Sequence, residues 1–429
     1  MVDYIQVFHT IAGSLDFLVL FGMTVVRKRR WRWLLVSLWA VSCLLVAICF
    51  NPLRHGEVML ATLTVWIHLP IVLVGAAILW MVRDGQKPFT LRRGLLGGGW
   101  IALAGAIVAI GYYAYRIEPY RLEQTTLRIQ SPKIQEKLRV VFVTDLHVSH
   151  VGTYEREVLR KIAAAKPDLL ILGGDTFQPE LEDVTRRHGF QLRGDFRRAY
   201  RWRQEVGRDF QKAWEDAGIL PPLGTWAVCG NHDAMWRVEP PISGVKWGWE
   251  TDSVPLRQDL LLTLLSVSDS RDVTGDTVYP DYSKTMLDSR FQIVVGHHPN
   301  PAENPTLRGD LFLAGHTHGG QVQIPGVTDL ARYVFGLFGA TFSFQSGRLV
   351  SVSGVDTYIS KGVGIAKLDA PRFRLNCPPE FLLLELEPAT QPNGKEDAVP
   401  KPPEMEANAY GPRSVGVRDG YQAHTEWRL

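Results

Sequence analysis

Residues 138–147 read LRVVFVTDLH, a stretch that joins a short apolar run to the polar residues Asp145 and His147. The run from 139 to 144 is rich in β-branched and aromatic residues and is short enough for a buried strand. Aspartate and histidine are both metal-ligand types, although either one alone at a strand end is more often a cap or a hydrogen-bonded polar group. The rest of the sequence has to decide between these interpretations.

The residues that follow predict that this strand belongs to a parallel sheet. Apolar residues at helical spacing over 154–165 predict a helix, and a second apolar run over 168–172 leads into Asp175. A strand, a helix and a strand in this order predict a βαβ unit with parallel strands. Asp145 and Asp175 are therefore expected at the same sheet edge, where open α/β sheets bind ligands.

The same arrangement recurs after three more apolar runs, at 225–229, 291–295 and 311–314. Each run leads into a glycine, which lets the chain turn sharply, and then into amide, carboxyl or imidazole side chains. Five strand ends thus supply seven candidate metal ligands: Asp145, His147, Asp175, Asn231, His297, His316 and His318. Their joint occurrence predicts a metal site.

The donor types narrow the choice of metal. Carboxylate oxygen, amide oxygen and imidazole nitrogen together suit two divalent ions such as Mn, Fe or Zn, whereas Ca and Mg prefer oxygen-only shells. Two ions about 3.5 to 4 Å apart need a shared carboxylate.

The motif order Asp-x-His, Gly-Asp, Gly-Asn-His-Asp, Gly-His and Gly-His-x-His resembles the calcineurin-like metallophosphoesterases. Four further segments are similar to the bacterial membrane-anchored branch of that family: RIEPYRLE at 116–123, HTHGGQ at 316–321, YISKGVG at 358–364 and CPPE at 377–380. The resemblance extends over about residues 116–388.

This resemblance implies a fold and a set of site roles. The fold would be a four-layered αββα sandwich over residues 138–388, with two β-sheets face to face and helices outside. One ion would be held by Asp145, His147, Asp175 and His318, and the other by Asp175, Asn231, His297 and His316. Asp175 would bridge the ions. His232 is the implied general acid for the leaving oxygen, a role weighed against that of a residue that only hydrogen-bonds the ligands.

Some positions depart from the family pattern. Gln178 stands where many members have an acidic residue that orients the catalytic histidine, and Asp233 is a possible replacement for that residue. His298 stands where asparagine is common, and residues 234–236 replace the usual turn. These departures concern substrate choice more than chemistry.

Residues 1–115 are dominated by apolar runs, unlike the rest of the chain. The whole chain has 46% hydrophobic and 21% charged residues and a net charge of +3, which indicates neither a disordered protein nor a nucleic-acid tail. Four apolar stretches are long enough to cross a bilayer, and they predict a transmembrane bundle: 5–26, 33–50, 58–82 and 94–115. Residues 116–137 would connect this bundle to the catalytic domain, and 389–429 would be a disordered tail. The four cysteines do not form a disulfide framework.

The basic residues between the spans predict an orientation. Nine Lys or Arg lie in the first and third connections, and Arg54 is the only Lys or Arg in the second. Lys- and Arg-rich loops stay in the cytoplasm, so the catalytic domain is expected on the extracytoplasmic side of the cell membrane.

Two other features are open to two interpretations. Asp16 and His68 fall within predicted spans, where ionisable groups are often functional, but a structural role inside the bundle is preferred. Residues 186–212 carry nine basic residues with interleaved aromatics. This segment either contacts a lipid surface or forms a helix whose aromatic residues enter the core.

The sequence therefore predicts a membrane-anchored, two-metal enzyme that hydrolyses a phosphomonoester, phosphodiester or pyrophosphate bond, in a lipid or envelope substrate. One alternative is a nuclease, which the predicted side of the membrane disfavours. The other is a non-catalytic sensor that binds a phosphorylated ligand, which the complete ligand set and His232 disfavour.

Overall fold

A computed structural model shows how these segments fold. It describes residues 2–25, 35, 38–39, 42, 64–82, 90–178, 196–233, 242–270, 282, 288–323, 326, 346–365 and 373–389. The helical N-terminal part contains α1 Val2–Val25, the π-helical turn η1 Thr64–His68, α4 Leu69–Val82, α5 Leu91–Arg116 and the 3₁₀ turn η2 Glu118–Tyr120.

The first of two six-stranded sheets has the order β1-β12-β2-β3-β4-β5. Its strands are β1 Glu123–Ser131, β2 Leu138–Val143, β3 Leu169–Leu172, β4 Thr225–Val228, β5 Val245–Gly248 and β12 Glu380–Pro388. β2, β3, β4 and β5 are parallel, which is the arrangement that the βαβ pattern predicts, whereas β12 is antiparallel to β2.

The second sheet has the order β10-β11-β9-β8-β7-β6. Its strands are β6 Asp252–Arg257, β7 Leu260–Leu264, β8 Phe291–Val295, β9 Leu311–Ala314, β10 Leu349–Val352 and β11 Val355–Ile359. The central strands β7, β8, β9 and β11 are parallel.

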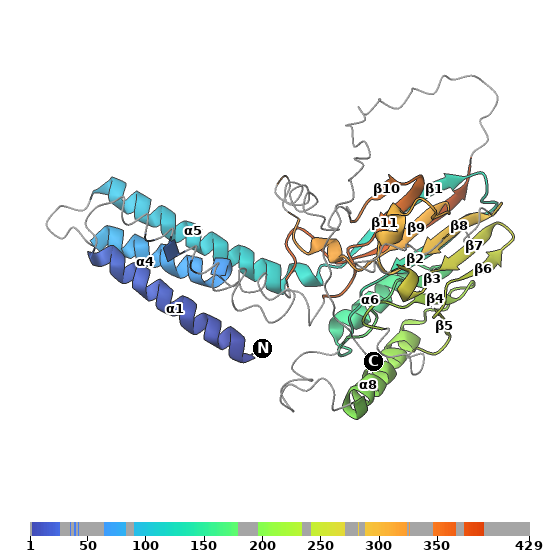
Figure 1. Ribbon diagram of the computed structural model, residues 1–429, viewed down its shortest axis with the longest axis horizontal. Coiled ribbons are helices and arrows are strands. Elements are labelled where there is room, and N and C mark those ends of the chain that lie inside the picture. Colours follow the sequence, from blue (N-terminus) through green and yellow to red (C-terminus); the bar gives the residue numbers. More distant parts are fainter. Residues whose placement is uncertain are drawn as a thin grey trace, which may run out of the picture. The chain divides into compact units, whose positions relative to one another are not determined.

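Alternation along the strands explains how the two sheets stack (Figure 1). In β2, Val140 and Phe142 enter a core that also contains Ile293 and Leu313 of the second sheet. Val141, on the opposite face of β2, belongs to a different core. Since successive side chains of a strand point to opposite faces, strands this apolar must be covered on both sides.

Helices complete the layers. The amphipathic helices α6 Thr153–Ala164 and α8 Phe196–Ala217 cover the outer face of the first sheet, where Leu159 and Phe210 join its core. The second sheet has its own outer core, and the short helical elements α9 Val267–Ser270 and η5 Asn300–Glu303 lie beside it. The turn η6 His318–Gly320 follows β9. The predicted α/β sandwich is confirmed.

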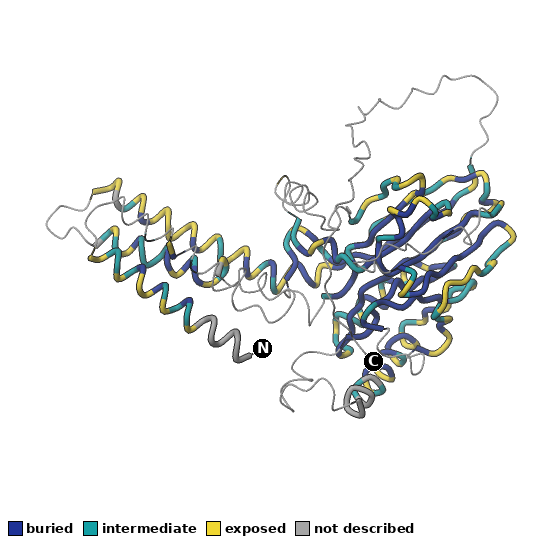
Figure 2. The backbone as a smooth tube through the Cα atoms, viewed as in Figure 1, coloured by how far each residue is buried: buried dark blue, intermediate teal, exposed yellow. Residues whose placement is uncertain are grey.

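The N-terminal part has one described helix that is long and apolar enough to cross a membrane, at Gly94–Tyr120. Shorter apolar helices occupy Thr10–Val25 and Val65–Met81, and most of the predicted span at 33–50 lies outside the described residues. Figure 2 shows exposed residues along α5, and these include Leu95, which is 67% exposed. Apolar side chains on an exposed helix surface need a partner or a lipid phase. The four-span bundle remains a prediction.

Asp16 and His68 contact each other. The two oxygens of the buried Asp16 carboxylate lie 2.8 Å from Trp39 Nε1 and 2.7 Å from His68 Nδ1. A buried carboxylate with both oxygens hydrogen-bonded joins three N-terminal segments, and this geometry agrees with the structural role preferred above.

The basic segment at 186–212 overlaps α8, and its residues 186–195 lie outside the described part, as do residues 390–429. Phe210 is buried in the core under α8, and Trp202 packs against that core and donates its indole N–H to the Ser149 carbonyl. These two aromatic side chains follow the second interpretation, a helix with its aromatics in the core.

Candidate metal centre

The carboxyl ends of β2, β3 and β4 in the first sheet and of β8 and β9 in the second place all seven predicted ligands in one cluster. Five of them have positive backbone φ angles: Asp145 at 55°, His147 at 44°, Asp175 at 53°, His316 at 68° and His318 at 49°. Residues other than glycine rarely adopt this left-handed conformation. Backbone strain of this kind is concentrated at functional sites. The turns after the strands aim these side chains inward.

One half of the cluster contains Asp145, His147 and His318. The Nε2 atoms of the two histidines are 3.0 Å apart. Asp145 Oδ1 lies 3.8 Å from His147 Nε2 and 3.5 Å from His318 Nε2. All three residues are buried.

The other half is built around His297. Its Nε2 lies 3.2 Å from Asn231 Oδ1 and 3.2 Å from Asp175 Oδ2, and its Nδ1 lies 2.8 Å from the Gly173 carbonyl oxygen. The His316 ring is 5.1 Å from the His297 ring, centroid to centroid. Asp175 Oδ2 is also 3.9 Å from His147 Nε2, so this carboxylate lies between the halves.

These spacings fit metal ions. A tetrahedral ion with bonds of about 2.1 Å separates its donors by about 3.4 Å. This is close to the 3.0 to 3.8 Å measured in the first half and the 3.2 Å measured in the second. The Nδ1 atoms of His147 and His318 are buried and have no hydrogen-bond partner among the described residues. If the proton of each neutral ring is on Nδ1, a cation between the rings would bind both Nε2 lone pairs.

Glycines allow this close approach. A Cβ added at Gly230 would lie 2.1 Å from Asp175 Oδ1, and one added at Gly315 would lie 2.4 Å from Asp145 Oδ2. Neither position tolerates a side chain without moving a carboxylate. The glycines that flank the ligand motifs are therefore part of the site.

The electrostatics of the cluster favour a bound cation. Burial lowers the pKa of His147 to about 3 and that of His316 to about 4, with neighbouring histidines adding to both shifts. Burial is the largest single influence on His297 and Asp175 and opposes their charged forms. Their attraction and hydrogen bond, together with neighbouring groups, outweigh it, raising the pKa of His297 to about 10 and holding that of Asp175 well below its usual value. Asp175 thus stabilises positive charge in the position where an ion would sit.

His232 is buried beside the cluster, and its Nε2 lies 3.9 Å from Asp175 Oδ2. The Gln178 amide nitrogen is 3.3 Å from His232 Nδ1. The same amide nitrogen is 3.5 Å from His232 Nε2, so Gln178 contacts both ring nitrogens. Asp233 is used differently, because its carboxylate accepts from the backbone N–H groups of Thr176 and Gly230. Burial, reinforced by the charge of Asp175, raises the pKa of Asp233 to about 6.

Two neighbours of the ligands were not predicted as site residues. The His298 ring lies 3.8 Å from the His316 ring, centroid to centroid, and His298 forms a group of possible ligands with His297 and His316. The doubled histidine after β8 was the available signal. Gly362, within the 358–364 segment, packs against Asp145 from a loop far along the chain.

A family model described as calcineurin-like phosphoesterase matches residues 138–320, which run from β2 to the turn after β9. The chain contains a calcineurin-like metallophosphoesterase domain. Within this domain the ligand cluster lies where the family motifs occur. The roles of the individual ligands and of His232 stay predictions.

Similar proteins carry matching names. The uncharacterized metallophosphoesterase YkuE of Bacillus subtilis is 27% identical over 313 residues, which cover 69% of this chain and 97% of YkuE. The UDP-2,3-diacylglucosamine pyrophosphatase LpxG of Chlamydia trachomatis is 24% identical, over 66% of this chain and 94% of LpxG. The phosphodiesterase YaeI of Escherichia coli is 26% identical, over 58% of this chain and 82% of YaeI. Together with the His/Asp cluster, these similarities make this chain a metal-dependent phosphoric ester hydrolase.

Proposed function

We propose that this metallophosphoesterase uses two divalent ions to hydrolyse a phosphodiester or pyrophosphate bond in a lipid-linked substrate at a membrane surface. The convergence of carboxylate, amide and imidazole donors from five strand ends carries the proposal. Mixed oxygen and nitrogen donors favour Mn, Fe or Zn as the ions.

Each residue of the cluster has a role in this proposal. Asp145, His147, Asp175 and His318 would hold one ion, and Asp175, Asn231, His297 and His316 would hold the other. When bound, two such cations supply positive charge for the phosphate oxygens and make water more acidic. His232, as the imidazolium, would donate a proton to the leaving oxygen and become the neutral ring.

Two observations support a lipid-linked substrate. Helix α5 is apolar, and its exposed side chains include Leu91, Leu95 and Leu103. It is followed after a short turn by β1, which pairs with β12 in the first sheet although it lies in the predicted connecting segment. A helix inserted in lipid would therefore keep the metal centre near the bilayer surface. In addition, one relative is named as a pyrophosphatase of a diacylated sugar nucleotide, and another as a phosphodiesterase.

A substrate panel tests the proposal. With Mn²⁺ present, purified full-length protein should hydrolyse a lipid-linked pyrophosphate or a phospholipid diester. The kcat/KM for that substrate should be at least about tenfold above the kcat/KM for a phosphomonoester lipid or for single-stranded DNA. A tenfold difference in kcat/KM corresponds to about 1.4 kcal/mol, which contacts made only by the preferred substrate can supply. Fastest cleavage of DNA would favour the nuclease, and metal binding without any hydrolysis would favour the sensor. Chelator-treated protein, with and without restored Mn²⁺, is the control.

The side of the membrane is part of the proposal. Nine basic residues in the two loops assigned to the cytoplasm, against Arg54 in the loop between them, favour an extracytoplasmic catalytic domain. Substrates made and kept in the cytoplasm would then be excluded.

Reporter fusions at Gln124, in β1, check this orientation. Alkaline phosphatase joined there should be active, because it folds outside the cytoplasm, and green fluorescent protein exported in the unfolded state should be dark. Removing the basic residues at 27–32 should reduce this difference between the two reporters. A bright, phosphatase-inactive pair of fusions would overturn both the orientation and the exclusion of cytoplasmic substrates.

A further inference from the structure

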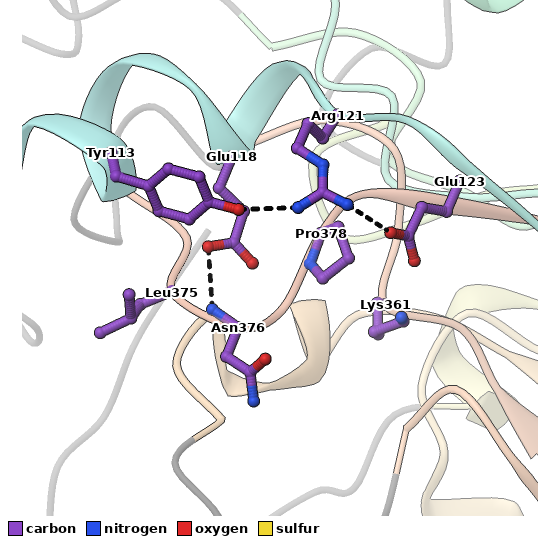
Figure 3. Close-up of a pocket in the computed structure, with 8 residues that line it drawn as sticks. All are labelled: Tyr113, Glu118, Arg121, Glu123, Lys361, Leu375, Asn376 and Pro378. Carbon is purple, nitrogen blue, oxygen red and sulfur yellow. Dashed lines mark hydrogen bonds and ion pairs between the residues drawn. The ribbon is translucent and has the colours of Figure 1, made fainter. Parts of the chain in front are cut away.

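Three segments that the proposed chemistry does not use meet beside the metal centre: 116–123, 358–364 and 373–380. They surround a cavity of about 470 Å³ at the end of α5, and Figure 3 shows Glu118, Arg121 and Lys361 around it. Two buried charged side chains connect these segments, Glu118 and Arg374.

Arg374 is fully buried, although burying a guanidinium is costly. Its terminal nitrogens donate to the backbone carbonyls of Lys361, Gly362 and Gly364 at 2.9, 3.2 and 2.7 Å, and to that of Cys377 at 3.1 Å. Its backbone N–H donates to the Ala114 carbonyl in the last turns of α5. The arginine therefore ties the 361–364 loop to the end of that helix.

The 361–364 loop in turn contacts the chain at Asp145. Gly364 N–H donates to the Asp145 carbonyl at 2.6 Å, and Val363 N–H donates to the Thr144 carbonyl at 3.0 Å. A Cβ added at Gly362 would lie 2.8 Å from the Asp145 Cβ. The loop thus supports the strained turn that presents Asp145 and His147.

Glu118 provides a second connection. Its buried carboxylate accepts the backbone N–H groups of Asn376 at 2.9 Å and Cys377 at 2.7 Å, and Figure 3 shows the contact with Asn376. The Cys377 thiol lies 3.6 Å from the His318 carbonyl oxygen, which it faces as a weak donor. This path also ends at a ligand of the Asp145, His147 and His318 half.

We infer that Glu118 and Arg374 are positioning residues that hold this half of the metal centre against the end of α5. Both paths end at Asp145 or His318. The other half is held differently, with His297 bonded to the Gly173 carbonyl and Asn231 following β4. The inference rests on the proposed two-ion site, and it requires that loss of Glu118 or Arg374 affects one ion more than the other.

The test compares Glu118→Gln and Arg374→Lys with two matched controls in the same region, Glu123→Gln and Arg121→Lys. Arg121 is exposed and Glu123 is half-buried, and the two contact each other beside the cavity, outside both paths. Mn²⁺ binding to full-length protein in detergent, without substrate, is measured by titration calorimetry and by electron paramagnetic resonance. Circular dichroism confirms that each variant is folded.

Wild type and controls should bind two Mn²⁺ ions. Glu118→Gln and Arg374→Lys should retain one ion within about twofold and bind the other about 10- to 100-fold more weakly, as is usual when groups that support metal ligands are changed. The paramagnetic resonance spectrum of the retained Mn²⁺ should match the spectrum of the ion that His147→Gln retains, because that variant damages the same half. It should differ from the spectrum of the ion that Asn231→Ala retains.

Equal weakening of both ions, or unchanged binding of both, would overturn the positioning role. If Arg374→Lys does not fold, Glu118→Gln decides. Wild-type protein that binds fewer than two ions would refute the two-ion site itself, whereas two ions in the wild type with unaltered variants would refute only the role of Glu118 and Arg374.

Discussion

Asp175→Asn should lower kcat/KM by about a thousandfold or more, the largest effect expected of a single substitution in this site. The Asp175 carboxylate lies between the two halves of the cluster, 3.2 Å from His297 Nε2 and 3.9 Å from His147 Nε2. Asparagine has nearly the same shape and retains an oxygen that can accept the His232 backbone N–H, which Asp175 Oδ1 accepts at 2.8 Å. The substitution therefore removes the charge that both proposed ions share.

Steady-state hydrolysis of an aryl phosphodiester with Mn²⁺, together with metal content by mass spectrometry, measures the effect. Asn231→Ala should lose only about 10- to 100-fold, because Asn231 is assigned to one ion and carries no charge. Asp168→Asn is the matched control, since Asp168 lies just before the same strand, β3, and bonds the Arg139 N–H at the opposite end. Normal metal content and near-normal activity in Asp175→Asn would remove the bridging assignment.

His232→Ala should slow the hydrolysis of substrates with alkyl leaving groups by about a hundredfold or more, and that of nitrophenyl substrates by much less. An alkoxide needs a proton as it departs, whereas nitrophenolate is stable as an anion. The His232 ring is buried beside the cluster, with its Nε2 3.9 Å from Asp175 Oδ2.

Rates for a matched pair of diesters that differ only in the leaving group give the measurement. His150→Ala provides a nearby exposed histidine as the control and should leave both rates unchanged. A loss by the same factor for both substrates would mean that His232 supports the ligands and does not transfer the proton.

Much of the catalytic domain could be predicted from local patterns. The strands at β2, β3, β4, β8 and β9 coincide with apolar runs in the sequence, because strands covered on both faces must be apolar throughout. The parallel order follows from the helix between β2 and β3, and parallel order brings the ends of β2 and β3 together. The meeting of Asp145 with Asp175 was therefore predictable from spacing alone.

Other parts of the site have no such local signal. Arg374 and Glu118 look like ordinary surface charges in the sequence, yet both are buried and bonded to backbone groups. The N-terminal spans are predicted from apolar length, and the described residues contain one helix long and apolar enough to cross a membrane. The four-span bundle therefore stays a prediction.

The sequence by itself determined the apolar strands, the polar residues that follow them and the donor types available for metal ions, because each depends only on neighbours along the chain. Only the tertiary structure decided which donors pair. It placed His147 against His318 and His297 against Asn231, and it placed the 361–364 loop on the turn at Asp145. These residues are far apart in sequence, and their distances depend on how two twisted sheets stack on a shared core. Stacking results from side-chain packing over the whole core, which no local pattern specifies.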